Sequence, residues 1–269
     1  MSSTRLNISL ERYEIGLSGA VPDRADWSEP AMDRGILEFV ALLSGLVFKY
    51  GGRIVHGSHP TFTPVIVHQA RLHAKAPVRK PITLVLSELW SREMREEEHQ
   101  ATADVAEVII TRVVGNGGTG DIDTRNRSLS AMREVLTESM NIVVAIGGKK
   151  HRGDGRVPGI QEELDLAARQ NIPRFVVAGM GGYAEEYSRN LDLSSLNNAL
   201  SREANAFLLS STDVGACVNL LLNHFGLSEK LPQMADRPIR WNSGIKQVVD
   251  HRDGNVDFHA NQLVFAAAT

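Results

Sequence analysis

The sequence is poor in cysteine, with Cys217 as the single thiol in 269 residues. This scarcity excludes an intramolecular disulfide framework and a zinc site built from several thiolates. Long apolar runs are also missing, since no stretch approaches the roughly 18 residues that a membrane helix needs. Residues 1–12 are polar where a signal peptide would be apolar. We therefore expect a cytoplasmic protein that does not associate with membranes.

An excess of charge of one sign is absent too. The 29 basic and 32 acidic residues give a formal net charge of −3, so nothing favours general binding to phosphate backbones. The sequence contains no H-E-x-x-H pair, no G-x-S-x-G elbow and no G-x-x-x-x-G-K-[ST] loop. His68 and His73 are five residues apart and do not share one helix face. We expect no nucleic-acid partner, no metal and no resident cofactor.

Short apolar runs alternate with amphipathic stretches along most of the chain. Several runs are apolar on consecutive residues, which is typical of strands buried on both faces of a parallel sheet. The predicted strands are Tyr13–Leu17, Arg53–Val55, Ile82–Leu86, Ala106–Thr111, Ile142–Ile146, Arg174–Ala178 and Ala206–Leu209. The predicted helices begin at a Ser28 cap with Pro30, and continue with Thr63–Ala74, Arg125–Ser139, Gly159–Gln170 and Asp213–Phe225.

This alternation predicts an α/β fold with a doubly wound, mostly parallel, Rossmann-like sheet over residues 1–230. After Leu231 the helical period disappears, and short strand-like runs surround an Asp-Gly turn at Asp253 and Gly254. We expect residues 231–269 to form a small C-terminal β appendage. It either packs on the main sheet as a flap or mediates self-association through exposed strand edges.

Ligands of doubly wound sheets bind beyond the carboxyl ends of the strands, so the loops there are the candidate sites. The first loop contains Ser18 and Gly19, where exposed backbone amides and a hydroxyl suit a phosphate. The second contains Gly57, Ser58, His59 and Thr61 ahead of a helix start that favours an anion. The alternatives are a tight turn at each glycine and a solvated His59.

Two later loops add further candidates. A glycine-rich loop with Gly118 precedes Arg125 and Arg127, either of which can pair with a phosphate or carboxylate, unless this is an ordinary surface loop. The fourth loop follows a buried strand and leads into a helix that carries two acids in its first turn. The alternative is that the acids are there because negative charge is favourable at a helix N-terminus. Only one of the two needs to face solvent for that, so the other can face a ligand. The candidates of the fourth loop are Gly147, Gly148, Lys149, Gly159, Glu162 and Glu163.

These loops, in this order, resemble the SLOG superfamily over roughly Tyr13 to Phe225. That superfamily includes the LOG nucleotide phosphoribohydrolases, the DprA/Smf proteins and the ligand-sensing domains of TRPM channels and their prokaryotic LSDAT relatives. The P-G-G-x-G-T-x-x-E motif of LOG proteins is altered here, because a basic insertion, Lys149 to Val157, separates Gly148 from Gly159, and Ile160 replaces the threonine. The resemblance places Glu163 at the catalytic glutamate, and Arg127, or else Arg125, at the catalytic arginine.

The resemblance implies three functions that the sequence leaves open. The expanded loop is similar to the prokaryotic sensor branch, which implies binding of an ADP-ribose, NAD-derived or cyclic nucleotide signal, with a separate TIR-type effector in bacterial antiphage defence. A LOG-like phosphoribohydrolase would instead use Glu163 and Arg127 to cleave an N-glycosidic bond. A third possibility is a self-assembling structural subunit. In each case we expect a homo-oligomer.

Overall fold

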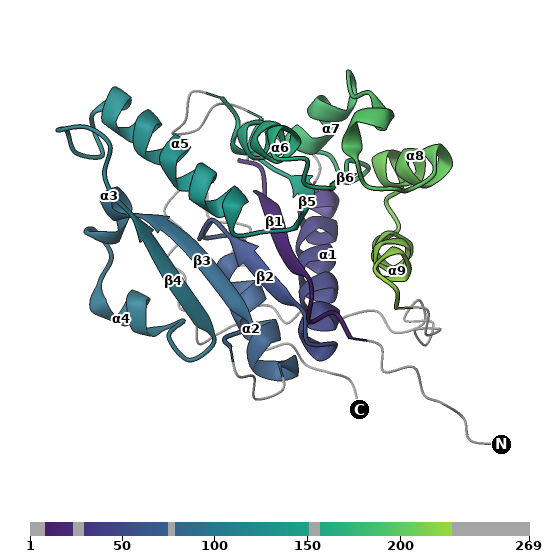
Figure 1. Ribbon diagram of the computed structural model, residues 1–269, viewed down its shortest axis with the longest axis horizontal. Coiled ribbons are helices and arrows are strands. Elements are labelled where there is room, and N and C mark those ends of the chain that lie inside the picture. Colours follow the sequence, from purple (N-terminus) through teal and green to yellow (C-terminus); the bar gives the residue numbers. More distant parts are fainter. Residues whose placement is uncertain (1–8, 24–29, 75–78, 151–156, 228–269) are drawn as a thin grey trace.

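Six parallel strands form one continuous sheet at the centre of the molecule. The computed structural model describes residues 9–23, 30–74, 79–150 and 157–227. The sheet order is β4-β3-β2-β1-β5-β6, and every neighbouring pair is parallel (Figure 1). The strands are β1 (Glu14–Ala20), β2 (Arg53–His56), β3 (Ile82–Ser87), β4 (Ala106–Thr111), β5 (Ile142–Gly147) and β6 (Arg174–Val177). The doubly wound parallel sheet predicted from the sequence is confirmed.

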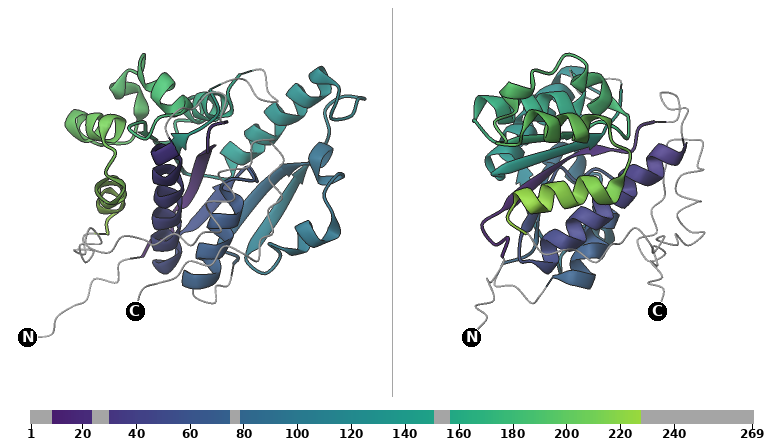
Figure 2. Two further views of the ribbon diagram at one scale, coloured as in Figure 1. Left: turned by 180° about the vertical axis from the view of Figure 1, so that it is seen from behind. Right: turned by 90° about the vertical axis from the view of Figure 1, so that its right-hand side faces the viewer.

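Helices cover both faces of this sheet, as the end-on view in Figure 2 shows. One core lies between the sheet and α1, α2 and α9, and a second lies between the sheet and α5, α6 and α7. β2 and β5 are buried along their whole length, which explains why their residues are apolar without alternation. The helices are α1 (Pro30–Lys49), α2 (Thr63–His73), α3 (Glu88–Ser91), α4 (Glu96–Gln100), α5 (Ile122–Glu138), α6 (Gly159–Arg169), α7 (Tyr183–Ser188), α8 (Arg202–Ser210) and α9 (Val214–His224), with a 3₁₀ turn η2 (Leu193–Leu196).

The order of the strands creates a switch point between β1 and β5. From β1 the chain proceeds outward through β2, β3 and β4, then crosses the sheet to add β5 and β6 on the other side. The loops that leave β1 and β5 therefore run in opposite directions, and a crevice opens between them at the carboxyl ends of the strands. This is the place where the fold favours ligand binding.

One predicted strand is wrong. Residues Ala206–Leu209 belong to the helix α8 and not to a strand. Ser201 caps this helix, because its hydroxyl accepts a hydrogen bond from the Ala204 amide at 3.1 Å. The helix buries Leu208 against the core and leaves Phe207 exposed. A run of four apolar residues fits a helix as well as a strand, so this run alone does not distinguish the two.

Some predictions lie outside the described residues. These are the Ser28 cap, the appendage 231–269, its boundary with the domain at residue 230, and most of the basic insertion that begins at Lys149. They stay predictions. Within the described ranges, none of the helices combines the length and the apolar character that crossing a bilayer requires.

Candidate functional site

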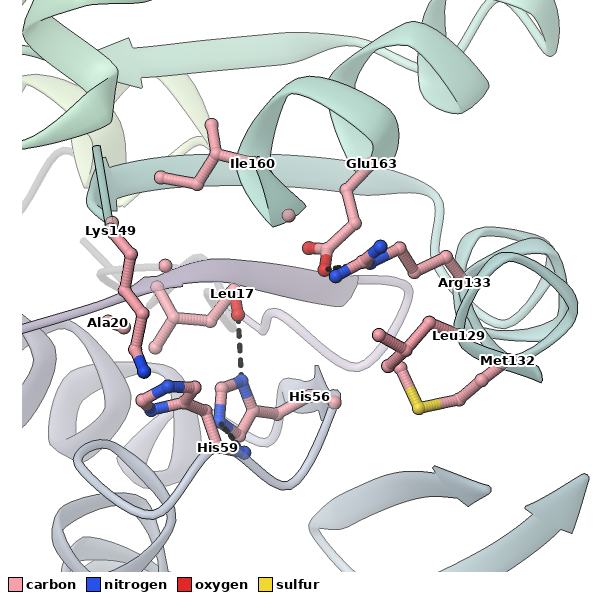
Figure 3. Close-up of a pocket in the computed structure, with 14 residues that line it drawn as sticks. Leu17, Ala20, His56, His59, Leu129, Met132, Arg133, Lys149, Ile160 and Glu163 are labelled. Carbon is pink, nitrogen blue, oxygen red and sulfur yellow. Dashed lines mark hydrogen bonds and ion pairs between the residues drawn. The ribbon is translucent and has the colours of Figure 1, made fainter. Parts of the chain in front are cut away.

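A partly open cleft of about 180 Å³ lies at the switch point, where β1, β2 and β5 end. The loops after these strands, the face of α5 and the first turn of α6 form its walls (Figure 3). It is lined by Leu17, Gly19, Ala20, His56, Gly57, His59, Leu129, Met132, Arg133, Gly148, Lys149, Gly159, Ile160 and Glu163.

Two glycines allow the β1 and β5 backbones to approach each other at the base of the cleft. Gly19 has a φ of +148°, and a Cβ added there would lie 2.0 Å from the Ile146 carbonyl oxygen. Gly147 has a φ of +64°, and its Cβ would lie 2.6 Å from the Ala20 carbonyl oxygen. Because no side chain fits at either position, the backbones of β1 and β5 lie close together here, and Gly19 exposes its backbone to the cleft.

His56, the last residue of β2, holds the loop that follows it. Its Nδ1 lies 2.8 Å from the Leu17 carbonyl oxygen, and its Nε2 lies 3.2 Å from the His59 amide (Figure 3). The first contact needs a proton on Nδ1, and the second needs a free electron pair on Nε2. The ring is therefore neutral, and burial lowers its pKa in agreement with this assignment.

His59 is also neutral, and its tautomer is fixed from the other side. Its Nδ1 accepts hydrogen bonds from the Thr61 hydroxyl at 2.9 Å and the Thr61 amide at 3.3 Å, so its Nε2 carries the proton. The Thr61 hydroxyl accepts a bond from the Val21 amide at 3.2 Å, which ties this loop to the end of β1. Burial lowers the pKa of His59 to about 3, with further lowering by His56 and Lys149.

Lys149 brings a cation to the same end of the cleft. Figure 3 shows its side chain extending from the β5 loop toward the His59 ring. Its ammonium group lies 3.4 Å from a carboxylate oxygen of Asp23, and both side chains are partly exposed. A screened pair of this kind is weak, so an anionic ligand can compete with Asp23 for the ammonium group.

The opposite wall carries a buried arginine between two glutamates. Arg133 of α5 forms a close ion pair with Glu162, and its Nε lies 3.7 Å from a carboxylate oxygen of Glu163. Glu162 also accepts a hydrogen bond from the Ser130 hydroxyl at 2.5 Å. The side chains of Arg133, Glu162 and Glu163 are only 10%, 18% and 13% exposed. Glu162 thus faces α5, whereas Glu163 lines the cleft.

Glu163 keeps its proton more readily than an ordinary glutamate. Burial raises the pKa of its carboxyl group, Arg133 and the Ser18 hydroxyl lower it, and Glu162 raises it again. Because burial is the largest contribution, the net pKa is raised. A carboxyl group of this kind can donate or accept a hydrogen bond, or transfer a proton to a ligand.

Both sides of the cleft also carry apolar side chains. Leu129 and Met132 from α5 lie on one side, while Ile160 from α6 and Leu17 from β1 lie on the other. The cleft therefore combines a cationic end, a protonatable carboxyl group and a surface for an uncharged ring. Among the described residues, no cluster of three or more histidine, cysteine or carboxylate side chains has the arrangement of a metal site.

The structure brings most of the candidate residues from the sequence to this cleft. The residues that line it are Gly19, Gly57, His59, Gly148, Lys149, Gly159 and Glu163. Four others support the lining without forming it, namely Ser18 beside Glu163, Thr61 bound to His59, Glu162 bound to Arg133, and Gly147 under β1. Ser58 turns the second loop with a φ of +56°.

Gly118, Arg125 and Arg127 do not line the cleft. Arg127 is exposed on α5 and pairs with Asp123 one turn earlier. Arg125 donates a hydrogen bond to the Thr119 carbonyl oxygen at 3.2 Å, within the glycine-rich loop. That loop borders a separate, more open hollow at the ends of β3 and β4. The arginine that lies beside Glu163 is Arg133, and the structure does not bring Arg127 and Glu163 together.

Sequence reasoning missed Arg133 and His56. Arg133 lies on the buried stripe of α5 that includes Ser128, Met132 and Leu136, whereas Arg127 lies off that stripe. A helical projection of residues 122–138 contains this signal, because it separates the inward arginine from the outward one. For His56 the signal in the sequence is weaker: it is the polar residue that directly follows the predicted strand Arg53–Val55.

Comparison with known proteins identifies the family of the chain. A family model described as SLOG cluster2 matches residues 10–213. No curated protein sequence matches the chain. The X-ray structure of TM1055, a Northeast Structural Genomics Consortium target, aligns with a TM-score of 0.45 at 14% sequence identity, covering 78% of this chain and 99% of its own. With three quarters of its length matched by the family model, the chain belongs to the SLOG family, in cluster 2.

Proposed function

We propose that the cleft binds a nucleotide-derived small molecule, with its phosphate at the Lys149 end and its ribose beside Glu163. One observation carries the proposal. Lys149 and His59 lie on one wall of the cleft, and the Arg133–Glu163 pair lies on the other, at the switch point of the sheet (Figure 3). Doubly wound sheets bind nucleotides at this position.

The phosphate end is argued from its donors. His59 offers a proton on Nε2 with no charge, and Lys149 offers an ammonium group that is only weakly paired. The first turn of the 11-residue helix α6 starts at Gly159 on the cleft wall, and its free amides carry partial positive charge. Together these groups favour an anion over a neutral ligand.

The other end suits a ribose and a base. A carboxyl group with a raised pKa can accept hydrogen bonds from one hydroxyl and donate to another group. Leu129 and Met132 provide an apolar surface where a base can lie. The ligand classes that fit are ADP-ribose or other NAD-derived molecules, nucleoside monophosphates and cyclic nucleotides.

As a finer proposal, the chain is a sensor that retains its ligand and passes the signal to a separate effector of the TIR type in bacterial antiphage defence. This rests on the resemblance of the expanded, basic Lys149–Val157 loop to the prokaryotic LSDAT branch. In such a role the chain would be no enzyme, and the cytoplasm is the compartment we expect.

A second candidate is a LOG-like phosphoribohydrolase, which one observation favours. Glu163 lines the cleft with a raised pKa, and Arg133 lies beside it. Cleavage of an N-glycosidic bond passes through a positively charged, oxocarbenium-like state, and a glutamate in its ionised form stabilises that charge or accepts the proton that the attacking water loses. In this chemistry Arg133 takes the role that the sequence assigned to Arg127.

The test is a ligand panel read by thermal shift and by chromatography of the recovered ligand. The panel contains ADP-ribose, its cyclic forms, NAD, AMP and cyclic dinucleotides. A ligand at 100 times its dissociation constant stabilises the fold by about 2.7 kcal/mol. We expect the shift in the wild type and in Arg127→Ala, and its loss in Lys149→Ala and His59→Ala.

The recovered ligand separates the two candidates. Intact ligand after binding supports the sensor. Release of a free base that stops in Glu163→Gln supports the hydrolase and contradicts the sensor. If no nucleotide shifts the wild type, or if Arg127→Ala loses the shift as Lys149→Ala does, the proposed site is wrong.

A further inference from the structure

A carboxylate lies at the phosphate end of the cleft, beside the donors of His59 and Lys149. One carboxylate oxygen of Asp23, three residues after the end of β1, lies 3.4 Å from the Lys149 ammonium group. Burial, His56 and Lys149 lower the pKa of His59, whereas the negative charge of Asp23 raises it, so Asp23 is close enough to act on both donors. A fixed negative charge at this place would repel the phosphate of a ligand.

The backbone brings Asp23 and Lys149 together. The Gly148 amide donates a hydrogen bond to the Ala20 carbonyl oxygen at 2.7 Å, which ties the loop after β5 to the end of β1. Lys149 directly follows this anchored residue. On the other loop, Asp23 directly follows Pro22, which is buried. The meeting of the two side chains therefore depends on how the loops are held and not only on the length of the lysine.

The contact between Asp23 and Lys149 can open. The two side chains are 44% and 36% exposed, so the Asp23 carboxylate can turn into water without losing its hydration. Because water screens such a pair, it changes an equilibrium by about five-fold at most. The contact keeps Asp23 beside Lys149 but is too weak to prevent a stronger anion from taking its place.

We propose that Asp23 is an internal competitor of the ligand: before binding, its carboxylate occupies the place beside Lys149 that a phosphate group takes, and the phosphate must displace it. The proposal rests on the proposed function, which assigns the phosphate to this end of the cleft. It adds a residue that sets the affinity and the charge of the ligands that bind.

Displacement makes the charge of the ligand a condition for using this end of the cleft. A phosphate monoester carries nearly two negative charges and three acceptor oxygens. It replaces the charge that Lys149 loses and can also accept the proton on Nε2 of His59. An uncharged nucleoside has nothing to place against Lys149 and leaves the pair with Asp23 intact. The ligand class that gains from this end is therefore phosphorylated.

The first experiment titrates the full chain with inorganic phosphate and follows the His59 ring by NMR. The His59 signals are the ones that the spectrum of His59→Gln lacks. Asp23→Asn keeps the shape of the side chain and removes its charge, and it should bind phosphate about two- to five-fold more tightly than the wild type. Asp23→Glu restores the carboxylate and should bind phosphate as the wild type does.

Asp123→Asn is the matched control. It removes the same charge from an exposed pair with Arg127 on α5, and neither residue lines the cleft. Its affinity for phosphate should equal that of the wild type. The proposal is overturned if Asp23→Asn binds phosphate no more tightly than the wild type, or if Asp123→Asn gains as much, since net charge alone would then explain the effect.

A second titration, with AMP and adenosine, separates this proposal from the proposed function. We expect Asp23→Asn to gain affinity for AMP and none for adenosine, and an equal gain for both would overturn the displacement. If AMP binds the wild type and Asp23→Asn gains nothing, the internal competitor is wrong and the nucleotide site stands. If phosphate binding tightens in Asp23→Asn while AMP moves no signal in either protein, the nucleotide is wrong and the competitor stands.

Discussion

Replacing Arg133 by methionine removes the one cation between two buried glutamates and keeps most of the side-chain volume. Glu162 and Glu163 would then be left in a poorly hydrated place without their counter-charge. Removing one partner of a buried ion pair costs about 3–5 kcal/mol, because the remaining charge is neither paired nor hydrated. Against a total stability of about 5–15 kcal/mol, this loss is large. It corresponds to a fall in Tm of about 6–20 °C for a chain of this size.

The pH dependence identifies the cause. In Arg133→Met the loss of the cation raises the folded-state pKa of Glu163, which burial already raises, further above its unfolded value. Stability of the variant is then retained at low pH, where the Glu163 carboxyl group is neutral, and is lost as pH rises through the folded pKa. The difference from the wild type is therefore largest at neutral pH and shrinks on acidification into the ordinary glutamate range.

Urea unfolding followed by circular dichroism measures this difference at each pH. Arg127→Met is the matched control, because it removes an exposed arginine of the same helix that pairs only with Asp123. Its cost should stay below about 1 kcal/mol. Adding Glu162→Gln to Arg133→Met should recover part of the loss. Equal costs for the two arginines, or a cost that does not change with pH, would refute the reasoning.

Three further predictions concern the cleft and the corrected helix. Gly19→Ala forces a Cβ to within 2.0 Å of the Ile146 carbonyl oxygen, so the variant should lose at least about 1–3 kcal/mol in urea unfolding. Ser201→Ala removes the cap from the Ala204 amide and should cost about 1 kcal/mol in thermal unfolding, whereas no cost would argue against the helix. Glu163→Gln should be more stable than the wild type at neutral pH, because the raised pKa means that the wild type loses stability as pH rises. Thermal scans at several pH values should show that advantage disappear toward low pH.

The sheet was predictable because its strands are buried on both faces. Consecutive apolar residues in β2 and β5 gave a signal that needed no knowledge of their neighbours. α8 was not predictable in the same way, because four apolar residues carry no period of their own. The short helices α3, α4 and α7 were missed since four to six residues contain too few turns for a stripe to appear.

The site was predictable as far as backbone rules reach. The carboxyl ends of parallel strands share one edge, so Gly19, His59 and Gly148 could be grouped from their order alone. The orientation of a helix about its axis decides which side chain enters the cleft. The position of an arginine in the loop order does not give this orientation, whereas the buried stripe of α5 includes Arg133 and leaves out Arg127. The network that fixes His59 through Thr61 and Val21 depends on contacts across 40 residues, which no local pattern encodes.

The two histidines of the cleft have a consequence for how ligand binding should respond to acidity. His56 is held as a neutral ring by its contacts on both nitrogens, and His59 has a pKa of about 3. Neither ring gains charge between mildly acidic and neutral pH, although histidine is the residue that usually does so there. The cleft therefore presents the same imidazole donors throughout that range. Among the described residues that line the cleft, Glu163 alone carries a carboxyl group, so a binding curve measured against pH reports mainly on that group and on the phosphate of the ligand itself.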